Sequence, residues 1–341
     1  MSWTIKGNGT GEDLLYSQAG TPSLDLRFAA TKALNDYVSG NNLITFTRAS
    51  SGTFVDSAGV LQTAATDVPR FDHNPTTGES LGLLVEEQRS NLLLNSGTLS
   101  TQSVAVTAVA HTLSFTGTGT ITLTGTSTAG PLVGTGTGES NRVSLKFTPT
   151  AGSLTLTVSG TVTNAQLESG AFATSYIPTS GAAATRSADV ASITGSAFSS
   201  WYRQDEGTVF VDAAEPPVYV TFQAYLTLQG ASILDEIRTW RTGTTTTTCY
   251  HVLNNVVQGN ISLTSSLSTN KFAHSYSAAQ GITGSVNGDS VTTSALASTI
   301  PVTLLRIGAR GNNTFYGNRT YKRLTYWPQR LADSTLQQIT Q

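Results

Sequence analysis

The stretch LITFTRASSGTFVDSAGVLQTAATDVPRFDHNPTTGESLGLLVEEQRSNLLL, Leu43–Leu94, decides how the fold of this chain is interpreted. Charged residues are concentrated here, although they make up only 12% of the 341 residues. Aromatic and β-branched residues alternate with turn-forming segments such as Ser57–Gly59 and Asn74–Gly78. This alternation predicts short strands joined by tight turns.

The charged residues of this stretch are expected to pair with one another. A half-buried arginine is costly unless a carboxylate neutralises it, and its planar guanidinium can bind a carboxylate through two parallel hydrogen bonds. We therefore predict a compact β-rich unit that is cross-tied by an ion-pair network. Its predicted members are Arg48, Asp56, Arg70, Asp72, Glu86, Glu87 and Arg89.

The composition of the whole chain favours an all-β fold, because Thr is common in strands, Gly in turns, and helix-forming runs are scarce. The formal net charge of -2 gives no electrostatic footprint for nucleic acid. A single cysteine, Cys249, excludes an internal disulfide framework. No apolar run approaches the ~20 residues of a membrane span, and the N-terminus lacks a signal-peptide pattern. We expect synthesis in the cytoplasm and no membrane insertion.

Changes in texture along the chain predict a small N-terminal β-rich unit followed by two antiparallel β-sandwiches of the jelly-roll type. Within residues 99–168, the segments Val104–Val106, Thr120–Thr124, Val143–Phe147 and Leu154–Val158 alternate strictly, as strands with one apolar face do. The expected divisions are an N-terminal arm (1–21), the Arg/Asp-rich unit (22–95), a small sandwich (96–180), a connector (181–194) and a larger sandwich (195–341).

The ends of the chain carry two further expectations. In the arm, Trp3 is a candidate anchor that would order on a neighbouring subunit. At the C-terminus, Asp333–Gln341 is expected to form a short helix that Asp333 or Ser334 caps, with Leu336 and Ile339 on one face.

The sequence has no residue pattern typical of a catalytic site. Glycoside hydrolysis needs two carboxylates facing each other at ~5–10 Å, whereas the pairs Asp205–Glu206 and Asp235–Glu236 are adjacent and point to opposite sides of a strand. The four histidines are scattered without zinc-ligand spacing. We therefore expect a protein that is not an enzyme and has no cofactor. Calcium at Asp289 is an alternative to a plain Asn-Gly hairpin there.

Sugar binding is the remaining chemical option, since an exposed aromatic ring beside polar groups is a typical platform for a saccharide. Trp240, which is flanked by arginines and precedes a threonine run, is the first candidate glycan contact. Tyr316, in an Asn-rich segment, is the second. Burial in a core is the competing interpretation for both rings.

The Leu43–Leu94 stretch also resembles a region that recurs in tailed-bacteriophage virion proteins. The matching segments are Phe46–Ser50, Thr53–Asp56, Gly59–Ala64, Pro69–Glu79 and Gly82–Leu94, followed by Asn164–Glu168, Thr174–Thr179 and Thr185–Asp189. Residues 96–180 resemble a carbohydrate-binding-module-like sandwich in topology. The C-terminal pattern Gly308, Gly317, Tyr326–Pro328 and Arg330–Leu331 is similar to the end of a concanavalin A-like (laminin G-like) sandwich.

This resemblance implies a structural protein located in the virion, in the tail-fibre, receptor-binding or adaptor class, that presents lectin-like domains to the host surface. A capsid decoration or head-fibre protein is one alternative, and a polysaccharide-degrading enzyme is a disfavoured second. The implied partners are other phage virion proteins, further copies of the chain in a trimer or dimer, and a host surface glycan.

Overall fold

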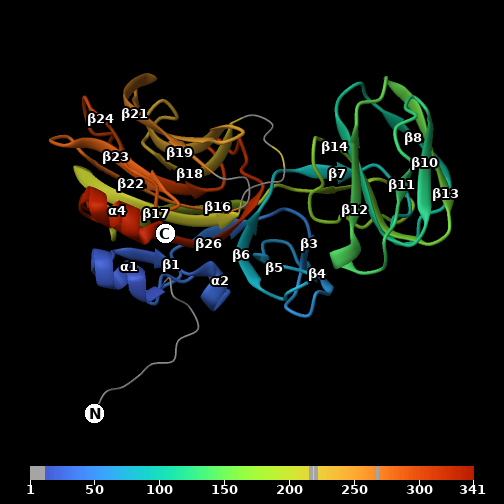
Figure 1. Ribbon diagram of the computed structural model, residues 1–341, viewed down its shortest axis with the longest axis horizontal. Coiled ribbons are helices and arrows are strands. Elements are labelled where there is room, and N and C mark those ends of the chain that lie inside the picture. Colours follow the sequence, from blue (N-terminus) through green and yellow to red (C-terminus); the bar gives the residue numbers. More distant parts are fainter. Residues whose placement is uncertain (1–11, 215–217, 219–221, 266–268) are drawn as a thin grey trace, which may run out of the picture.

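The computed structural model describes residues 12–214, 218, 222–265 and 269–341. In this part the protein forms two β-sandwiches that lie side by side, the larger at the left and the smaller at the right of Figure 1. The helices are short, so the predicted all-β class is confirmed. No helix among the described residues combines the length and apolarity needed to cross a membrane.

The larger sandwich has two antiparallel sheets that enclose one apolar core. The first sheet runs β24 (Thr292–Ser294), β23 (Gly281–Val286), β22 (Thr269–Ser277), β17 (Glu206–Ala214), β26 (Arg319–Trp327), β6 (Ser80–Val85), β5 (Phe71–His73), and β1 (Leu24–Leu26) also pairs with β26. The second runs β2 (Thr45–Thr47), β16 (Val190–Thr194), β25 (Leu304–Ile307), β18 (Gln223–Gln229), β19 (Glu236–Gly243), β20 (Thr246–Leu253), β21 (Val256–Thr264).

The N-terminal unit expected at residues 22–95 is not a separate body. Its strands β1 and β6 pair with β26, and β2 pairs with β16, so they extend the sheets of the larger sandwich. Their apolar side chains, such as Leu26 and Leu83, belong to the same core as Leu324. Among the strands of this unit, the hairpin of β3 (Gly52–Val55) and β4 (Leu61–Ala64) and the strand β7 (Arg89–Asn91) lie outside these two sheets. The sequence prediction failed here because pairing with strands more than 140 residues away leaves no local signal.

A backbone approach explains one glycine of this region. Gly82 on β6 has φ +86°, and a Cβ at this position would lie 1.9 Å from the carbonyl oxygen of Tyr321 on β26. A side chain would therefore force β6 and β26 apart.

The smaller sandwich has a core of its own that includes Leu113, Phe115 and Leu156. One sheet runs β11 (Leu132–Val133), β10 (Thr120–Gly125), β13 (Gly152–Ser159), β8 (Gln102–Val106), and the other runs β12 (Val143–Phe147), β9 (His111–Gly117), β14 (Val162–Ser169). A 3-10 helix, η1 (Glu139–Asn141), precedes β12. The alternating segments predicted as strands are therefore strands, and β9, which is buried along its whole length, was not predicted.

The connector expected at 181–194 is strand-forming rather than irregular. β15 (Ala184–Arg186) pairs with β7 (Arg89–Asn91), and β16 sits between β2 and β25. A short helix, α3 (Gly195–Ser199), follows β16. β16 therefore belongs to the larger sandwich and supplies Ile193 to its core, whereas β15 and β7 form a separate two-stranded sheet.

The two ends of the described chain meet on the outer face of the first sheet. α1 (Glu12–Ala19), from the segment expected to be a loose arm, packs beside the C-terminal α4 (Asp333–Ile339), below the sheet in Figure 1. Leu15, Phe210, Trp327 and Leu336 form the apolar cluster under them. The predicted terminal helix is confirmed, but Ala332 occupies its N-cap position and no side chain caps it. Trp3 lies outside the described residues.

Candidate functional site

A buried cluster of charges lies where the two sandwiches meet, and Asp189 is its centre. One Asp189 oxygen accepts from Arg48 Nη1 at 3.1 Å, and the other accepts from Arg70 Nη2 at 2.5 Å. The second oxygen also accepts the backbone N–H of Glu86 at 2.9 Å. All three charged side chains of Arg48, Arg70 and Asp189 have no exposed surface. One carboxylate therefore neutralises two buried arginines.

Glu86 is the second carboxylate of this junction cluster. It pairs with Arg70 at 2.8 Å and with Arg186 at 3.1 Å, and it accepts from the backbone N–H and the hydroxyl of Ser175. Burial alone would raise its pKa, but Arg186, Arg70 and Ser175 outweigh that effect and lower the pKa of Glu86 to about 2. The group is consequently ionised throughout the neutral range.

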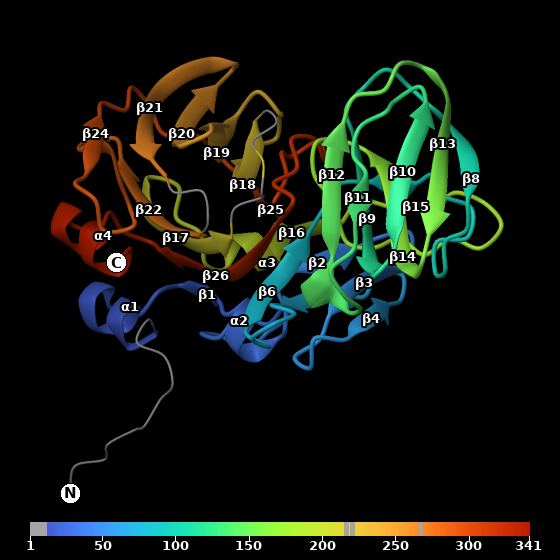
Figure 2. The same cartoon turned by 45° about the vertical axis from the view of Figure 1, so that its right-hand side comes forward.

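The junction cluster reaches the smaller sandwich through hydrogen bonds to the segment that follows β14. Arg70 Nη1 donates to the Ser175 hydroxyl at 2.6 Å, and the Thr53 hydroxyl donates to the Tyr176 carbonyl at 2.5 Å. Beside them, the Asn91 amide donates to the carbonyls of Ala165 and Ile177. These bonds link β3, β7 and the larger sandwich to the smaller one, whose strand β14 lies just above β3 in the view of Figure 2.

Four residues predicted for the network lie outside it. Asp56 is half-exposed, and its carboxylate accepts from the backbone N–H groups of Ala58 and Val60 and from the Gln62 side-chain amide. Its hydrogen-bond partners therefore come from the same hairpin and not from an arginine. Asp72 accepts the N–H of Val55 at 2.7 Å, and burial raises its pKa to about 6.

Glu87 and Arg89 form a separate ion pair, in which Arg89 also lies over the Phe172 ring at 5.2 Å. Conversely, sequence reasoning missed Arg186 and Asp189 as members of the cluster. Both stand in a segment otherwise poor in charge, between Thr185 and Val190, and that isolation was the available signal.

The two candidate glycan contacts are not exposed platforms. Trp240 is 4% exposed, because Phe222 and Phe315 pack against its ring and Arg238 lies over it at 4.4 Å. It lies on β19, a strand that the sequence interpretation treated as a loop. Tyr316 is 8% exposed and belongs to the larger core. The competing interpretation, burial, is therefore the correct one for both rings.

Two of the four histidines, which the sequence showed as scattered, lie close together in the fold. His251 on β20 and His274 on β22 face each other across the larger core, with ring centroids 6.0 Å apart. Within the described residues, neither ring has a hydrogen-bond partner. Burial lowers both pKa values, that of His274 to about 4. Among the described residues, no three His, Cys, Asp or Glu side chains are grouped to hold a metal, and this includes the surroundings of Asp289.

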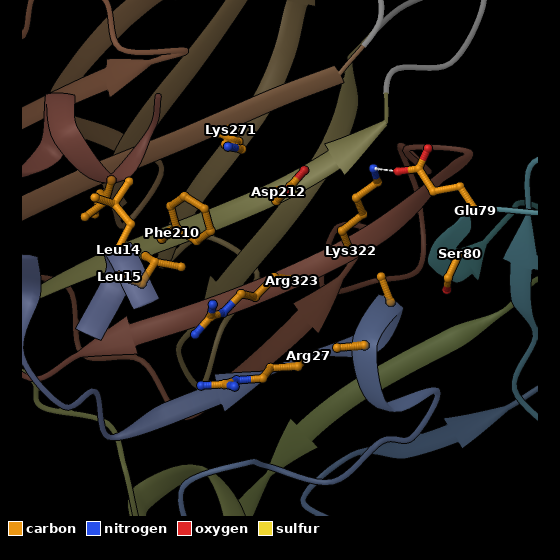
Figure 3. A pocket seen from close by; sticks show the side chains of 13 residues that line it. Leu14, Leu15, Arg27, Glu79, Ser80, Phe210, Asp212, Lys271, Lys322 and Arg323 are labelled. Carbon is orange, nitrogen blue, oxygen red and sulfur yellow. Dashed lines mark hydrogen bonds and ion pairs between the residues drawn. The ribbon is translucent and has the colours of Figure 1, made fainter. Parts of the chain in front are cut away.

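A pocket of about 410 Å³ opens on the outer face of the first sheet, between that sheet and the helices α1, α4 and α2 (Phe28–Thr31). Figure 3 shows Phe210, Asp212 and Arg323 along its floor, with Leu14 and Leu15 on one side and Lys322 and Glu79 on the other. Its volume is in the range of small-molecule sites.

Comparison with known proteins gives similarity in structure only. No protein-family model matches the sequence, and no curated protein matches it. The NanB sialidase of Streptococcus pneumoniae aligns at 12% identity with a TM-score of 0.37, over 43% of this chain and 26% of that one. The chain thus spans about a quarter of that sialidase.

Two smaller binding domains align to a similar degree. The CBM40 domain of the Ruminococcus gnavus IT-sialidase aligns at 13% identity and a TM-score of 0.36, over 41% of this chain and 84% of that one. The binding domain of botulinum neurotoxin serotype G aligns at 10% identity and a TM-score of 0.36, over 44% and 40%. Similarity at this level supports no statement about activity or ligand.

Proposed function

We propose that this chain is a non-enzymatic structural protein of a tailed-bacteriophage particle, of the tail-fibre or adaptor class, which holds two β-sandwiches in a fixed relation. The starting point is the sequence pattern of Leu43–Leu94, which resembles virion proteins of such phages. The outer loops of the sandwiches are then the parts available to other virion proteins or to a host surface.

The observation that carries the proposal is the position of the charged residues of that pattern. Arg48, Arg70 and Glu86, with Asp189 of the matching Thr185–Asp189 segment, are buried at the junction. They line none of the larger pockets and hold backbone groups of both sandwiches. Residues placed in this way serve rigidity, since a buried network of ion pairs and hydrogen bonds fixes the groups it binds.

Rigidity suits a protein that works through geometry. A spacer that transmits position must not bend between its parts, and domains in one chain move relative to each other unless their interface is firmly held. The junction cluster supplies that hold in this chain. The low charge content agrees with a surface that does not attach nonspecifically to nucleic acid.

The test is the location of the chain on particles from a strain that carries its gene. Particles would be purified on a density gradient, washed in high salt, probed by immunoblot and labelled with gold-conjugated antibody. We expect the chain to band with intact particles and the gold to lie on the tail. Gold over the head would support a capsid decoration protein instead, and a chain found only in the soluble fraction would refute both.

The enzyme alternative has its own test. The purified chain would be incubated with capsular and cell-wall polysaccharide of the host, and reducing ends would be measured. We expect no release above a heat-treated control. Release that scales with protein concentration would overturn the non-enzymatic assignment.

A further inference from the structure

In the pocket on the outer face of the first sheet, one hydrogen-bond acceptor (the Asp212 carboxylate) and one donor (Arg323 Nη1) have no partner among the described residues. Asp212, on β17, is half-buried and has no hydrogen-bond or ion-pair partner in the part of the chain that the structure describes. Its cross-strand neighbour Arg323 is turned away toward Asp25, which it binds through Nε and Nη2 at 2.7 Å each. Arg323 Nη1 has no such partner, and Figure 3 shows this side chain at the pocket floor.

Two lysines add positive charge around Asp212. Lys271 Nζ donates to the carbonyl of Gln341 at 2.5 Å, and Lys322 Nζ pairs with Glu79 at 2.6 Å. Each ammonium group has three protons and uses one of them in these bonds. Neither lysine forms an ion pair with Asp212, so both signs of charge are presented to a ligand.

The opposite side of the pocket is apolar. Leu14 and Leu15 of α1, Phe210 of β17 and Ile339 of α4 line it. Phe210 and Leu15 are also part of the cluster that fixes the two helices on the sheet. These buried side chains support the wall, and the more exposed lining residues Leu14 of α1 and Ala29 and Ala30 of α2 can pack against the C–H face of a ligand.

We propose that this pocket binds a carboxylated saccharide. The ligand carboxylate pairs with Arg323 Nη1 and the lysines, ring hydroxyls donate to Asp212, and the C–H face packs on Leu14, Ala29 and Ala30. A phosphate dianion fits less well because Asp212 and Glu79 repel it. A neutral sugar leaves the excess of cations without a partner. This inference goes beyond the proposed location on a particle and does not depend on it.

The state of Asp212 agrees with this assignment. Burial raises the pKa of Asp212, and nearby Lys322, Lys271 and Arg323 lower it by less. A desolvated carboxylate without a hydrogen-bond donor is unfavourable, and a hydroxyl that donates to it removes part of that cost.

The test is calorimetric titration of the purified full-length chain with methyl glycosides of glucuronic acid, galacturonic acid and N-acetylneuraminic acid. The matched neutral probes are the methyl glycosides of glucose and galactose. We expect at least one carboxylated probe to bind at least tenfold more tightly than its neutral counterpart. No binding of any carboxylated probe, or equal binding of the neutral ones, overturns the proposal. Tighter binding of inorganic phosphate than of every saccharide does the same.

Variants place the binding in this pocket. Asp212→Asn and Lys271→Gln should each weaken binding at least tenfold, whereas Asp289→Asn and Lys146→Gln, which change the same residue types on exposed surface elsewhere, should not. Circular dichroism and chemical-shift maps check that each variant folds. A folded Asp212→Asn protein with unchanged affinity refutes the assignment. Because binding is measured on the isolated chain, its failure is separate from a failure of the particle-location test.

Discussion

Replacing Arg70 by alanine tests the junction cluster most sharply. The Arg70 side chain has no exposed surface, and its guanidinium binds Asp189, Glu86, the Ser175 hydroxyl and the Thr53 carbonyl. Arg70→Ala therefore leaves Glu86 with Arg186 and Ser175, and Asp189 with Arg48 and the backbone N–H of Glu86. Removing one partner of a buried ion pair costs about 3–5 kcal/mol, so we expect the free energy of unfolding to fall by that amount.

The assay is unfolding in guanidinium chloride, followed by circular dichroism and by tryptophan fluorescence. Two probes are needed because two sandwiches need not unfold in a single step. Arg203→Ala is the matched control, since Arg203 is about half exposed and pairs with exposed Asp205, and exposed ion pairs contribute little to stability. Arg70→Lys keeps the charge but loses the planar fork, and we expect an intermediate loss. If Arg70→Ala loses no more stability than Arg203→Ala, the cluster does not hold the fold.

Three further predictions concern groups away from the cluster. Burial lowers the pKa of His274 to about 4 in the folded protein, so its ring takes up a proton less readily when folded than when unfolded. The free energy of unfolding is therefore retained above pH 6.5 and falls as the pH drops toward 4, by up to about 1.4 kcal/mol per pH unit. His274→Leu removes this effect, and its acid-unfolding midpoint should lie at lower pH than that of the parent protein. The pH dependence that Asp72 contributes has the opposite sign, because its pKa is raised to about 6 and its charged form destabilises the folded protein above pH 6. Asp72→Asn should therefore stabilise the folded protein at pH 8 by up to about 3 kcal/mol and have little effect at pH 4. Equal effects at the two pH values would contradict this. Gly82→Ala should lose more than about 1 kcal/mol, since its Cβ would collide with the Tyr321 carbonyl, and a melting temperature equal to that of the parent would show that β6 can move away.

Local patterns in the sequence were sufficient for the strands but not for their partners. Alternation identified Leu154–Val158 as a strand because one face of β13 is buried and the other is not. It failed for β9, where both faces are buried, and for β19, where Glu236 is completely buried between Arg238 and Arg310 and so looks like a polar loop.

The sequence predicted that a buried ion-pair network exists, but it did not predict all of the residues that form it. A need for carboxylate partners at Arg48 and Arg70 follows from the cost of burying charge, but the sequence does not show that a residue 119 positions beyond Arg70 supplies one. The same limit applies to Trp240, since Phe222 and Phe315 cover it from other parts of the chain. The pocket on the first sheet left no sequence signal, because helices from the two ends of the chain build its walls.

The central claim is that this chain is a stiff structural component of a phage particle. A cryo-electron microscopy map of intact particles from a strain that carries the gene tests it most directly. The account predicts tail-associated density into which both sandwiches fit together as one rigid body, in the relation that the junction cluster sets. Density in which the sandwiches need separate placement, or particles that lack the chain, would contradict it.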